Sequence, residues 1–139
     1  MSSADYRALA EFRYQIRRFL RFSEQAARRA GLEPAQHQLI LAVKAHAGEP
    51  TVGELAERLQ LQHHSVVGMI DRLAECGLVR RNRAEDDRRR VRVRLTPKGQ
   101  SVLRQLSLEH RAEIGSAGGA LVRVLHAILA RAKETCTTS

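Results

Sequence analysis

Eight arginines lie in the stretch from Leu78 to Arg94, which is the part of the chain whose residue types and spacing point most directly to chemistry. Three acidic residues at 85–87 separate two flanks in which residues alternate as they do in β-strands. The pattern predicts a hairpin with strands from Leu78 to Arg83 and from Val91 to Thr96. Because like charges repel, such a hairpin is stabilised when a polyanion lies against it.

The charge of the whole chain points the same way. Its 139 residues include 24 Lys and Arg against 15 Asp and Glu, for a formal net charge of +9. This excess favours nucleic acid or an anionic surface as a partner. No run of about 18 apolar residues is present, so we expect no membrane span and no membrane partner. Without a secretory signal or a metal-binding cysteine spacing, we expect a cytoplasmic protein with reduced cysteines.

Several helices must position this hairpin. Spaced apolar residues predict a long helix from Tyr6 to Ala30 and a second one that begins at Pro34. Thr51-Val52-Gly53-Glu54 is a capping box that begins a short third helix. We expect a tight turn at Leu61-Gln62 and then a fourth helix from His63, capped by Gly77.

Helix resumes after the hairpin. Thr96 is the expected N-cap and Pro97 the first residue of a helix that runs towards Ile114. We expect Gly115, Gly118 and Gly119 to break it and a last helix to run from Ala120 to Lys133. The predicted fold class is therefore mainly α with a small β-hairpin. Two helices joined by a tight turn and followed by a hairpin form a winged helix-turn-helix, in which a helix enters the DNA major groove.

Four segments, in order, resemble the multiple-antibiotic-resistance regulator (MarR) family of bacterial transcription factors. They are GLEPAQHQLILAV, TVGELAERLQL, SVVGMIDRLAECGLVRR and DDRRRVRVRLTPKG. The resemblance runs from about Phe12 to Leu129. It implies a homodimer joined through the first and last helices. Residues 1–33 and 116–139 would then form the dimerisation region, and residues 34–115 the winged helix-turn-helix with a long connecting helix.

The resemblance also implies a function. Members of this family mostly repress transcription at palindromic operators, and many release double-stranded DNA when a small phenolic or aromatic ligand binds. The base-contacting residues would lie at the start of the fourth helix and one turn further along. Gly68 and Val67 depart from the polar residues common in the family. The full set carried over is Gln62, His63, His64, Ser65, Val67, Gly68 and Arg72.

The wing supplies a second group of expected DNA contacts. By resemblance, one wing arginine, for which we expect Arg88 or Arg90, enters the minor groove, where the negative potential is deepest. Acids brace the others: Asp87 lies in the wing motif, and we expect Asp71 to pair with Arg89. The alternative is a solvated hairpin whose charges pair only with each other.

The ligand pocket of the family varies widely. We expect an aromatic acid to contact mainly apolar side chains and one cation. The candidates are Phe12, Ile16, Phe19, His37 and Arg17. The alternative is that these side chains only pack the dimer core.

Other functions find less support. The chain has no carboxylate pair, nucleophile elbow or phosphate-binding loop, so we expect no enzyme. The six histidines lack a metal-binding spacing, and we expect neither metal nor cofactor. Cys76 is interpreted as a small apolar residue at a helix end rather than an oxidant sensor. The remaining alternatives are a ligand-independent or a redox-responsive winged-helix protein that binds nucleic acid.

Overall fold

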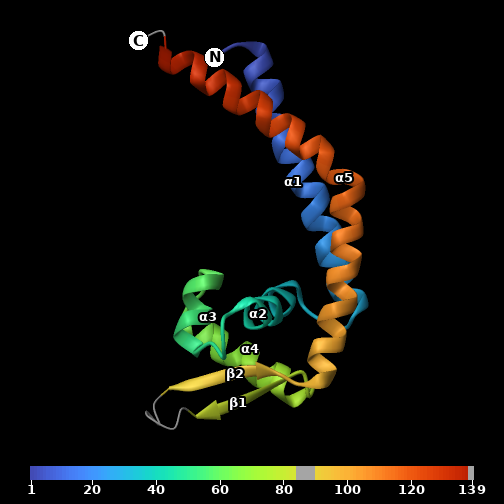
Figure 1. The fold of residues 1–139 in the computed structure, drawn as a ribbon, viewed down its shortest axis with the longest axis vertical. Helices are drawn as coiled ribbons and strands as arrows, with labels where there is room; N and C mark the ends of the chain where they lie inside the picture. Colours follow the sequence, from blue (N-terminus) through green and yellow to red (C-terminus); the bar gives the residue numbers. More distant parts are fainter. Residues whose placement is uncertain (84–89, 138–139) are drawn as a thin grey trace. The chain divides into compact units, whose positions relative to one another are not determined.

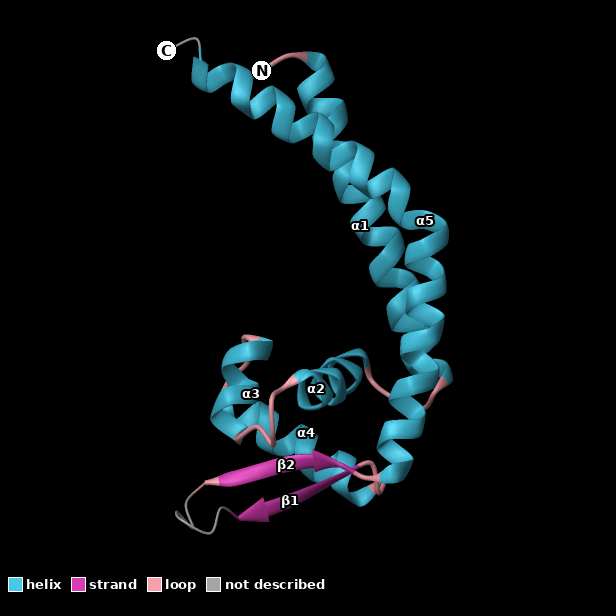
Figure 2. Cartoon of the chain, in the orientation of Figure 1, coloured by secondary structure: helices cyan, strands magenta, loops and turns pink. Residues whose placement is uncertain are grey.

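The computed structural model describes residues 1–83 and 90–137, and the chain divides into two compact units. One unit combines Met1–Ala26 with Leu108–Ser139, and the other is Ala27–Ser107. Helices dominate, and the described strands form one two-stranded antiparallel sheet, so the predicted fold class is confirmed (Figures 1 and 2). The elements in order are α1 (Ser3–Arg29), α2 (Pro34–Ala45), α3 (Val52–Leu59), α4 (His63–Glu75), β1 (Val79–Arg83), β2 (Val91–Leu95) and α5 (Pro97–Thr137).

The unit Ala27–Ser107 is held by a core of aliphatic side chains from its helices and from both strands. The apolar spacing predicted for α4 is present, since Val66, Met69, Ile70 and Leu73 are all buried. A left-handed Gly77, with φ of 74°, ends the turn after α4 and lets the Leu78 amide donate to the Leu73 carbonyl over 2.9 Å. The largest fully buried aliphatic side chains are Leu39, Ile40, Leu55, Val66, Ile70, Leu73, Val79, Val93 and Leu106.

The hairpin is paired over its whole described length. Val79 lies opposite Leu95, and Arg83 lies opposite Val91. The chain just before α3 adds a short third element, because the Val93 amide donates to the Pro50 carbonyl over 2.9 Å. The wing is therefore anchored to the start of the helix-turn-helix as well as to its own partner strand.

Helix α5 runs without interruption from Pro97 to Thr137, so the predicted break at Gly115, Gly118 and Gly119 is wrong. Each glycine inside a helix costs about 1 kcal/mol relative to alanine. The surrounding sequence offsets this cost, because Ala117, Ala120 and Leu121 are strong helix formers and the same stretch packs on α1. The packing of α5 on α1 therefore outweighs the low helix propensity of the three glycines.

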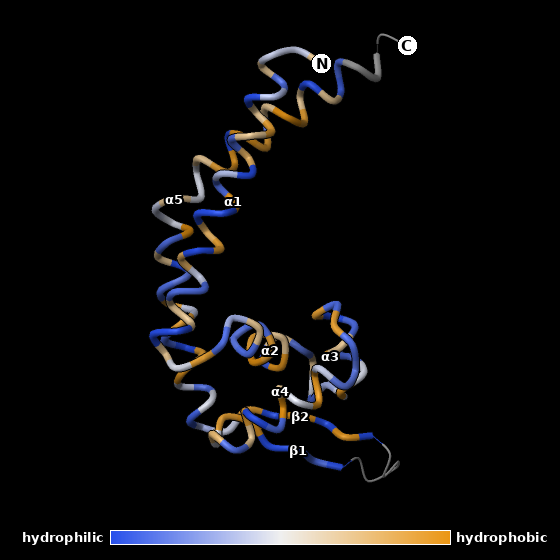
Figure 3. Tube along the Cα trace, turned by 180° about the vertical axis from the view of Figure 1, so that it is seen from behind, coloured by the Kyte–Doolittle hydropathy of each residue, from blue (hydrophilic) through white to orange (hydrophobic). Residues whose placement is uncertain are grey.

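The unit Met1–Ala26 with Leu108–Ser139 is an antiparallel pair of helices. The His110 ring meets Phe19 and Phe22 edge-on, at centroid distances of 6.0 and 5.5 Å. At the other end, Arg131 donates to Asp5 over 3.2 Å. Two helices cover little apolar surface, and Figure 3 shows hydrophobic residues along both. The exposed large ones in this unit include Leu9, Leu20, Ile114, Val122 and Leu129.

The stretch Pro97–Glu134 of α5 also meets the length and composition of a membrane-spanning helix, against the expectation that no segment would. None of the 18-residue window of α5 that passes this test is buried within the chain. Length and composition alone are weak grounds for a membrane span, because a core helix of a soluble protein passes the same test. A helix that a second subunit covers has the same apolar composition.

Candidate nucleic-acid interface

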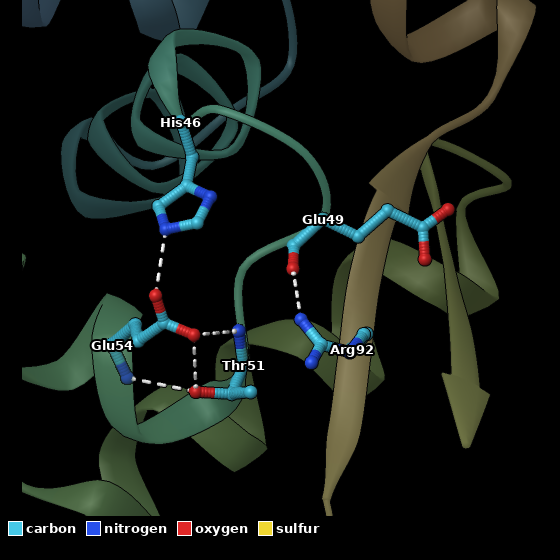
Figure 4. Close-up of polar contacts among 5 residues, drawn as sticks. All are labelled: His46, Glu49, Thr51, Glu54 and Arg92. Carbon is cyan, nitrogen blue, oxygen red and sulfur yellow. Dashed lines mark hydrogen bonds and ion pairs between the residues drawn. The ribbon is translucent and has the colours of Figure 1, made fainter. Parts of the chain in front are cut away.

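A polar network fixes the start of α3 against the end of α2 (Figure 4). The Glu54 amide donates to the Thr51 hydroxyl over 3.2 Å, and the Thr51 amide donates back to the Glu54 carboxylate over 3.2 Å. This is the capping box predicted from the sequence. The second carboxylate oxygen of Glu54 accepts from His46 Nε2 over 2.7 Å. His46 is the C-cap residue of α2, so one carboxylate holds two helix ends together.

These donors also act on the acidity of Glu54. The Thr51 amide, and then the His46 side chain, hold the pKa of the Glu54 carboxyl below its ordinary value of 4.5. The folded state therefore favours the ionised carboxylate, which contributes stability above pH 4.5 that is lost as the pH falls through the folded pKa.

We accordingly expect Glu54→Gln to destabilise the protein near pH 7 and to cost progressively less below pH 4.5. Urea unfolding of both proteins at a series of pH values from 7 to 3 measures the difference. The amide keeps only part of the helix-cap hydrogen bonds, so the part of the cost that changes with pH is the charge-dependent share. A difference that stays constant down to pH 3 would contradict the ionic role of Glu54.

The turn between α3 and α4 exposes the N-terminal end of α4. Gln60 adopts a left-handed conformation with φ of 56° and ends α3, and Gln62 is the N-cap of α4. The predicted turn is thus present, with its sharpest residue at Gln60. The residue type of Gln60 does not predict a left-handed conformation, because glycine and asparagine are the usual left-handed residues at a helix end.

The predicted base-contacting residues share one side of α4. Gln62, His63, His64, Ser65 and Arg72 are exposed, while Val67 and Gly68 are half-buried. They lie away from the buried face of α4 that packs on the core. These seven residues are called the α4 surface below.

A cavity of about 350 Å³ joins the α4 surface to the wing. His63 and Val67 of α4 line it together with Arg81 and Arg90, and its walls are mostly apolar. The structure therefore brings Arg90, from just before β2, close to two of the residues predicted on α4. Arg88, Arg89 and Asp87 lie outside the described residues.

Asp71 pairs with a wing residue that the sequence did not indicate, whereas its expected partner Arg89 lies outside the described residues. Its carboxylate pairs with the guanidinium of Arg81 on β1. Both side chains are nearly half-exposed, so the pair contributes at most about 1 kcal/mol to stability. Strand alternation could have indicated Arg81, since it lies opposite Val93, whose side chain is buried in the core.

The opposite face of the hairpin carries cations of its own. Arg80 lies directly opposite Arg94. Arg92 donates to the Glu49 carbonyl over 2.9 Å, which ties β2 to the segment before α3 (Figure 4). His46, Glu49 and Arg81 are thus positioning residues that pattern reasoning missed, because their partners are distant in sequence.

The predicted ligand residues belong to different units. Phe12, Ile16, Arg17 and Phe19 lie on α1, and His37 is buried within Ala27–Ser107. Of the five, Phe19 lines a cavity of about 200 Å³ between α1 and α5, together with Gln15, Arg18, Ile114 and Leu121. A shared ligand site stays a prediction.

Two expectations about chemistry concern cysteine and metal. Cys76 is the C-cap of α4 and is exposed, so it does not pack as an apolar helix end. Among residues 1–83 and 90–137, no group of three or more His, Cys, Asp or Glu side chains is placed to hold a metal ion.

The sequence and the fold each match known proteins. The MarR family model matches residues 30–90. The HTH-type transcriptional repressor MdtR of Bacillus subtilis is 33% identical over 75 residues, which cover 54% of this chain and 48% of MdtR. The chain spans about half the length of the curated relatives it matches.

Solved structures resemble the chain over a greater length. AbsC, a MarR family transcriptional regulator from Streptomyces coelicolor, superposes with a TM-score of 0.76 at 19% identity, covering 100% of this chain and 98% of AbsC. A mutant of Escherichia coli MarR complexed with operator DNA gives a TM-score of 0.67 at 22% identity, covering 86% and 89% of the two chains. At these identities the likeness shows the fold. The chain therefore has the fold of MarR family regulators, and its residues 30–90 match the MarR family model.

Proposed function

We propose that this chain is a sequence-specific double-stranded DNA-binding transcriptional regulator that acts as a homodimeric repressor in the cytoplasm. The observation that carries the proposal is the α4 surface. It presents exposed polar side chains at the N-terminal end of a helix, on a scaffold braced by Glu54 and Asp71. The first residues of a recognition helix are the ones that reach base edges.

Charge supports the DNA partner. The wing strands alone contribute Arg80, Arg81, Arg83, Arg92 and Arg94 beside the α4 surface. Most of these side chains are exposed, and only Arg81 forms an ion pair among the described contacts. Cations that lack acidic partners are available for phosphates.

Exposed apolar side chains support the homodimer. Leu20, Ile114, Val122 and Leu129 are between 49% and 59% exposed on α1 and α5. In a monomer this apolar surface would be exposed to water, and the simplest way to bury it is against the helix pair of a second copy. Repression as the output follows the relative MdtR, which is a transcriptional repressor.

Release by a small aromatic or phenolic ligand is the finer part of the proposal. The apolar cavity beside Phe19, with Arg18 on its wall, suits an aromatic acid of modest size. Phe12, Ile16, Arg17 and His37 are the further contacts that the family resemblance predicts. The alternative is a regulator without a ligand, or one that responds to oxidation.

The test compares the affinity of the chain for a selected DNA site with its affinity for a scrambled duplex. We expect the purified chain, offered a random-sequence duplex pool, to select a palindromic site. It should then bind that site more than about 10³ times more tightly than a scrambled duplex at the same salt concentration. Fluorescence anisotropy measures both affinities, and sedimentation establishes whether two copies bind one duplex.

The rival functions predict different numbers. A ratio near one with steep salt dependence would mean an architectural nucleic-acid binder. A specific complex that aromatic acids leave unchanged, and that peroxide disrupts, would favour the redox-responsive alternative. Absence of any DNA binding at low salt would overturn the proposal.

A further inference from the structure

A cavity of about 450 Å³ lies beside the hairpin, within the compact unit Ala27–Ser107. Its volume is in the usual range for sites that bind small molecules. The end of α2, the segment before α3, both strands and the start of α5 all contribute to its walls. It shares no described residue with the cavities beside His63 and Phe19. Its polar lining includes Lys44, His46, Glu49, Arg80, Arg94 and Gln100.

Three cationic side chains line this cavity: Lys44 from α2, Arg80 from β1 and Arg94 from β2. All three residues are exposed. In the part of the chain that the structure describes, none of the three side chains forms an ion pair or a hydrogen bond. Their N–H donors are therefore available to an anion that enters the cavity.

Glu49 is the acidic residue among the described residues that line the cavity. Its side chain extends towards β1 (Figure 4), where the amide nitrogen of Asn82 lies 3.4 Å from both carboxylate oxygens. Three cations against one carboxylate leave the walls with a formal charge of +2 when histidine is neutral. The cavity therefore favours an anion with two negative charges.

The two arginines of the cavity are directly opposed on neighbouring strands, Arg80 on β1 and Arg94 on β2. Like charges in this arrangement destabilise a sheet, because the Cβ atoms of opposed residues lie only about 5 Å apart. Neither arginine fills the core, since both are exposed. An anion between the two guanidinium groups would remove the repulsion. A pair that breaks a local rule of sheet stability in this way is typical of a functional site.

We propose that this cavity binds a small molecule that carries a phosphate monoester group, held by Arg80, Arg94 and Lys44. Such a group carries a charge of about −1.5 to −2 near pH 7, which matches the formal charge of the walls. Guanidinium groups bind phosphate oxygens through paired N–H donors, and lysine adds a point charge. Val43 and Leu95 supply apolar wall for the organic part of the ligand.

The DNA backbone is another source of phosphate near the hairpin, and its chemistry differs. Each backbone phosphate is a diester with one negative charge, whereas the walls of the cavity balance two. A small molecule, unlike a duplex, can also enter a cavity that lies among α2, the hairpin and α5. A monoester dianion therefore fits this site better than a stretch of DNA.

Isothermal titration calorimetry on the full chain without DNA tests the site, with methyl phosphate as the probe. The titration is made at about pH 7.5, where the monoester is mostly a dianion. Dimethyl phosphate carries one charge, as a DNA phosphate does, and succinate carries two charges on separate carboxylates. Both are titrated at the same ionic strength. We expect methyl phosphate to bind at least about tenfold more tightly than either, because it offers two charges to three converging cations.

Charge-removing variants locate the site. Glutamine in place of each cation keeps most of the aliphatic stem, so the variants are Lys44→Gln, Arg80→Gln and Arg94→Gln. Each should weaken methyl phosphate binding by about tenfold to a hundredfold, the usual effect of a lost hydrogen bond to a charged group. Arg58→Gln is the matched control, because it removes an exposed arginine of α3 in the same compact unit, outside the lining of this cavity. It should bind methyl phosphate as the unmodified chain does.

The unfolding temperature without ligand gives an independent readout. Arg80→Gln removes the repulsion from Arg94, so it should not lower the Tm when methyl phosphate is absent. With methyl phosphate present, the Tm of the unmodified chain should rise, and that of Arg80→Gln should rise much less. A lower Tm for Arg80→Gln without ligand would mean that the opposed arginines stabilise the hairpin, against the proposal.

Three further results would overturn the proposal. If methyl phosphate does not bind, or binds no more tightly than dimethyl phosphate, the cavity is not a monoester site. If Arg58→Gln weakens binding as much as the cavity variants, the protein attracts anions through a diffuse field. Tighter binding of succinate would assign the cavity to dicarboxylates instead. Because the titration contains no DNA, its result does not depend on the proposed function. Circular dichroism identifies a loss of fold, and Lys44→Gln on the exposed side of α2 decides the matter if a strand variant does not fold.

Discussion

Gly99→Ala is expected to destabilise the winged helix-turn-helix by at least about 3 kcal/mol, the upper end of what overpacked substitutions usually cost. A Cβ on Gly99 would lie 2.0 Å from the Leu78 carbonyl oxygen and 3.0 Å from its carbon. The obstacle is backbone, which cannot turn aside as a side chain can. Helix α5 would have to move away from the start of β1.

That movement would break a set of hydrogen bonds at the same point. The Leu78 carbonyl accepts from the Thr96 amide over 3.0 Å, and the Thr96 hydroxyl donates to the Gly77 carbonyl over 2.6 Å. The same hydroxyl accepts from the Gly99 amide over 3.0 Å, which caps α5. Leu78 and Thr96 are both buried, so a donor or acceptor that loses its hydrogen bond there costs the protein the full desolvation penalty of that group.

Thermal unfolding followed by circular dichroism measures this effect, and a fall in Tm of more than about 10 °C is expected. Gly115→Ala is the matched control, because it lies in the same helix with nothing within 4 Å of the added methyl. Alanine there should stabilise the helix by up to about 1 kcal/mol. Equal changes in Tm for the two variants would show that α5 does not approach Leu78 this closely in solution.

Local signals predicted the helix-turn-helix well. Thr51 and Glu54 form a capping box from residues three apart, and Gly77 ends α4 through its own conformation. Both features depend on the nearest neighbours in sequence, so the residue types alone indicate them. The apolar spacing correctly predicted the buried face of α4 for the same reason, because the helical repeat places residues three and four apart on one face whatever the helix packs against.

Features that depend on distant partners escaped prediction. Asp71 pairs with Arg81, and the choice among nearby arginines depends on strand register. The bond from the Val93 amide to the Pro50 carbonyl joins segments with no shared pattern. The continuous α5 was missed because glycine propensity was weighed without the packing of α1 against it. Sequence marks where an element begins, and tertiary contacts decide which partner it takes.

DNA affinity should depend steeply on salt, and the wing should account for a measurable part of that dependence. If two copies neutralise six or more phosphates, affinity falls about 10³-fold or more between 50 and 200 mM salt. Each lost phosphate contact lowers the slope of log affinity against log salt by about 1. We expect Arg88→Ala and Arg90→Ala each to reduce this slope.

A matched charge change distinguishes a wing contact from the general field of a basic protein. Arg111 is exposed on the part of α5 that belongs to the other compact unit, so Arg111→Ala removes the same charge from outside the proposed interface. Its slope should equal that of the unmodified chain. Arg90 also lines the cavity shared with His63 and Val67, so its variant tests whether wing and α4 surface engage one duplex. If Arg88→Ala and Arg90→Ala both leave affinity and slope unchanged, the wing does not touch DNA. The +9 charge would then act only as a diffuse attraction.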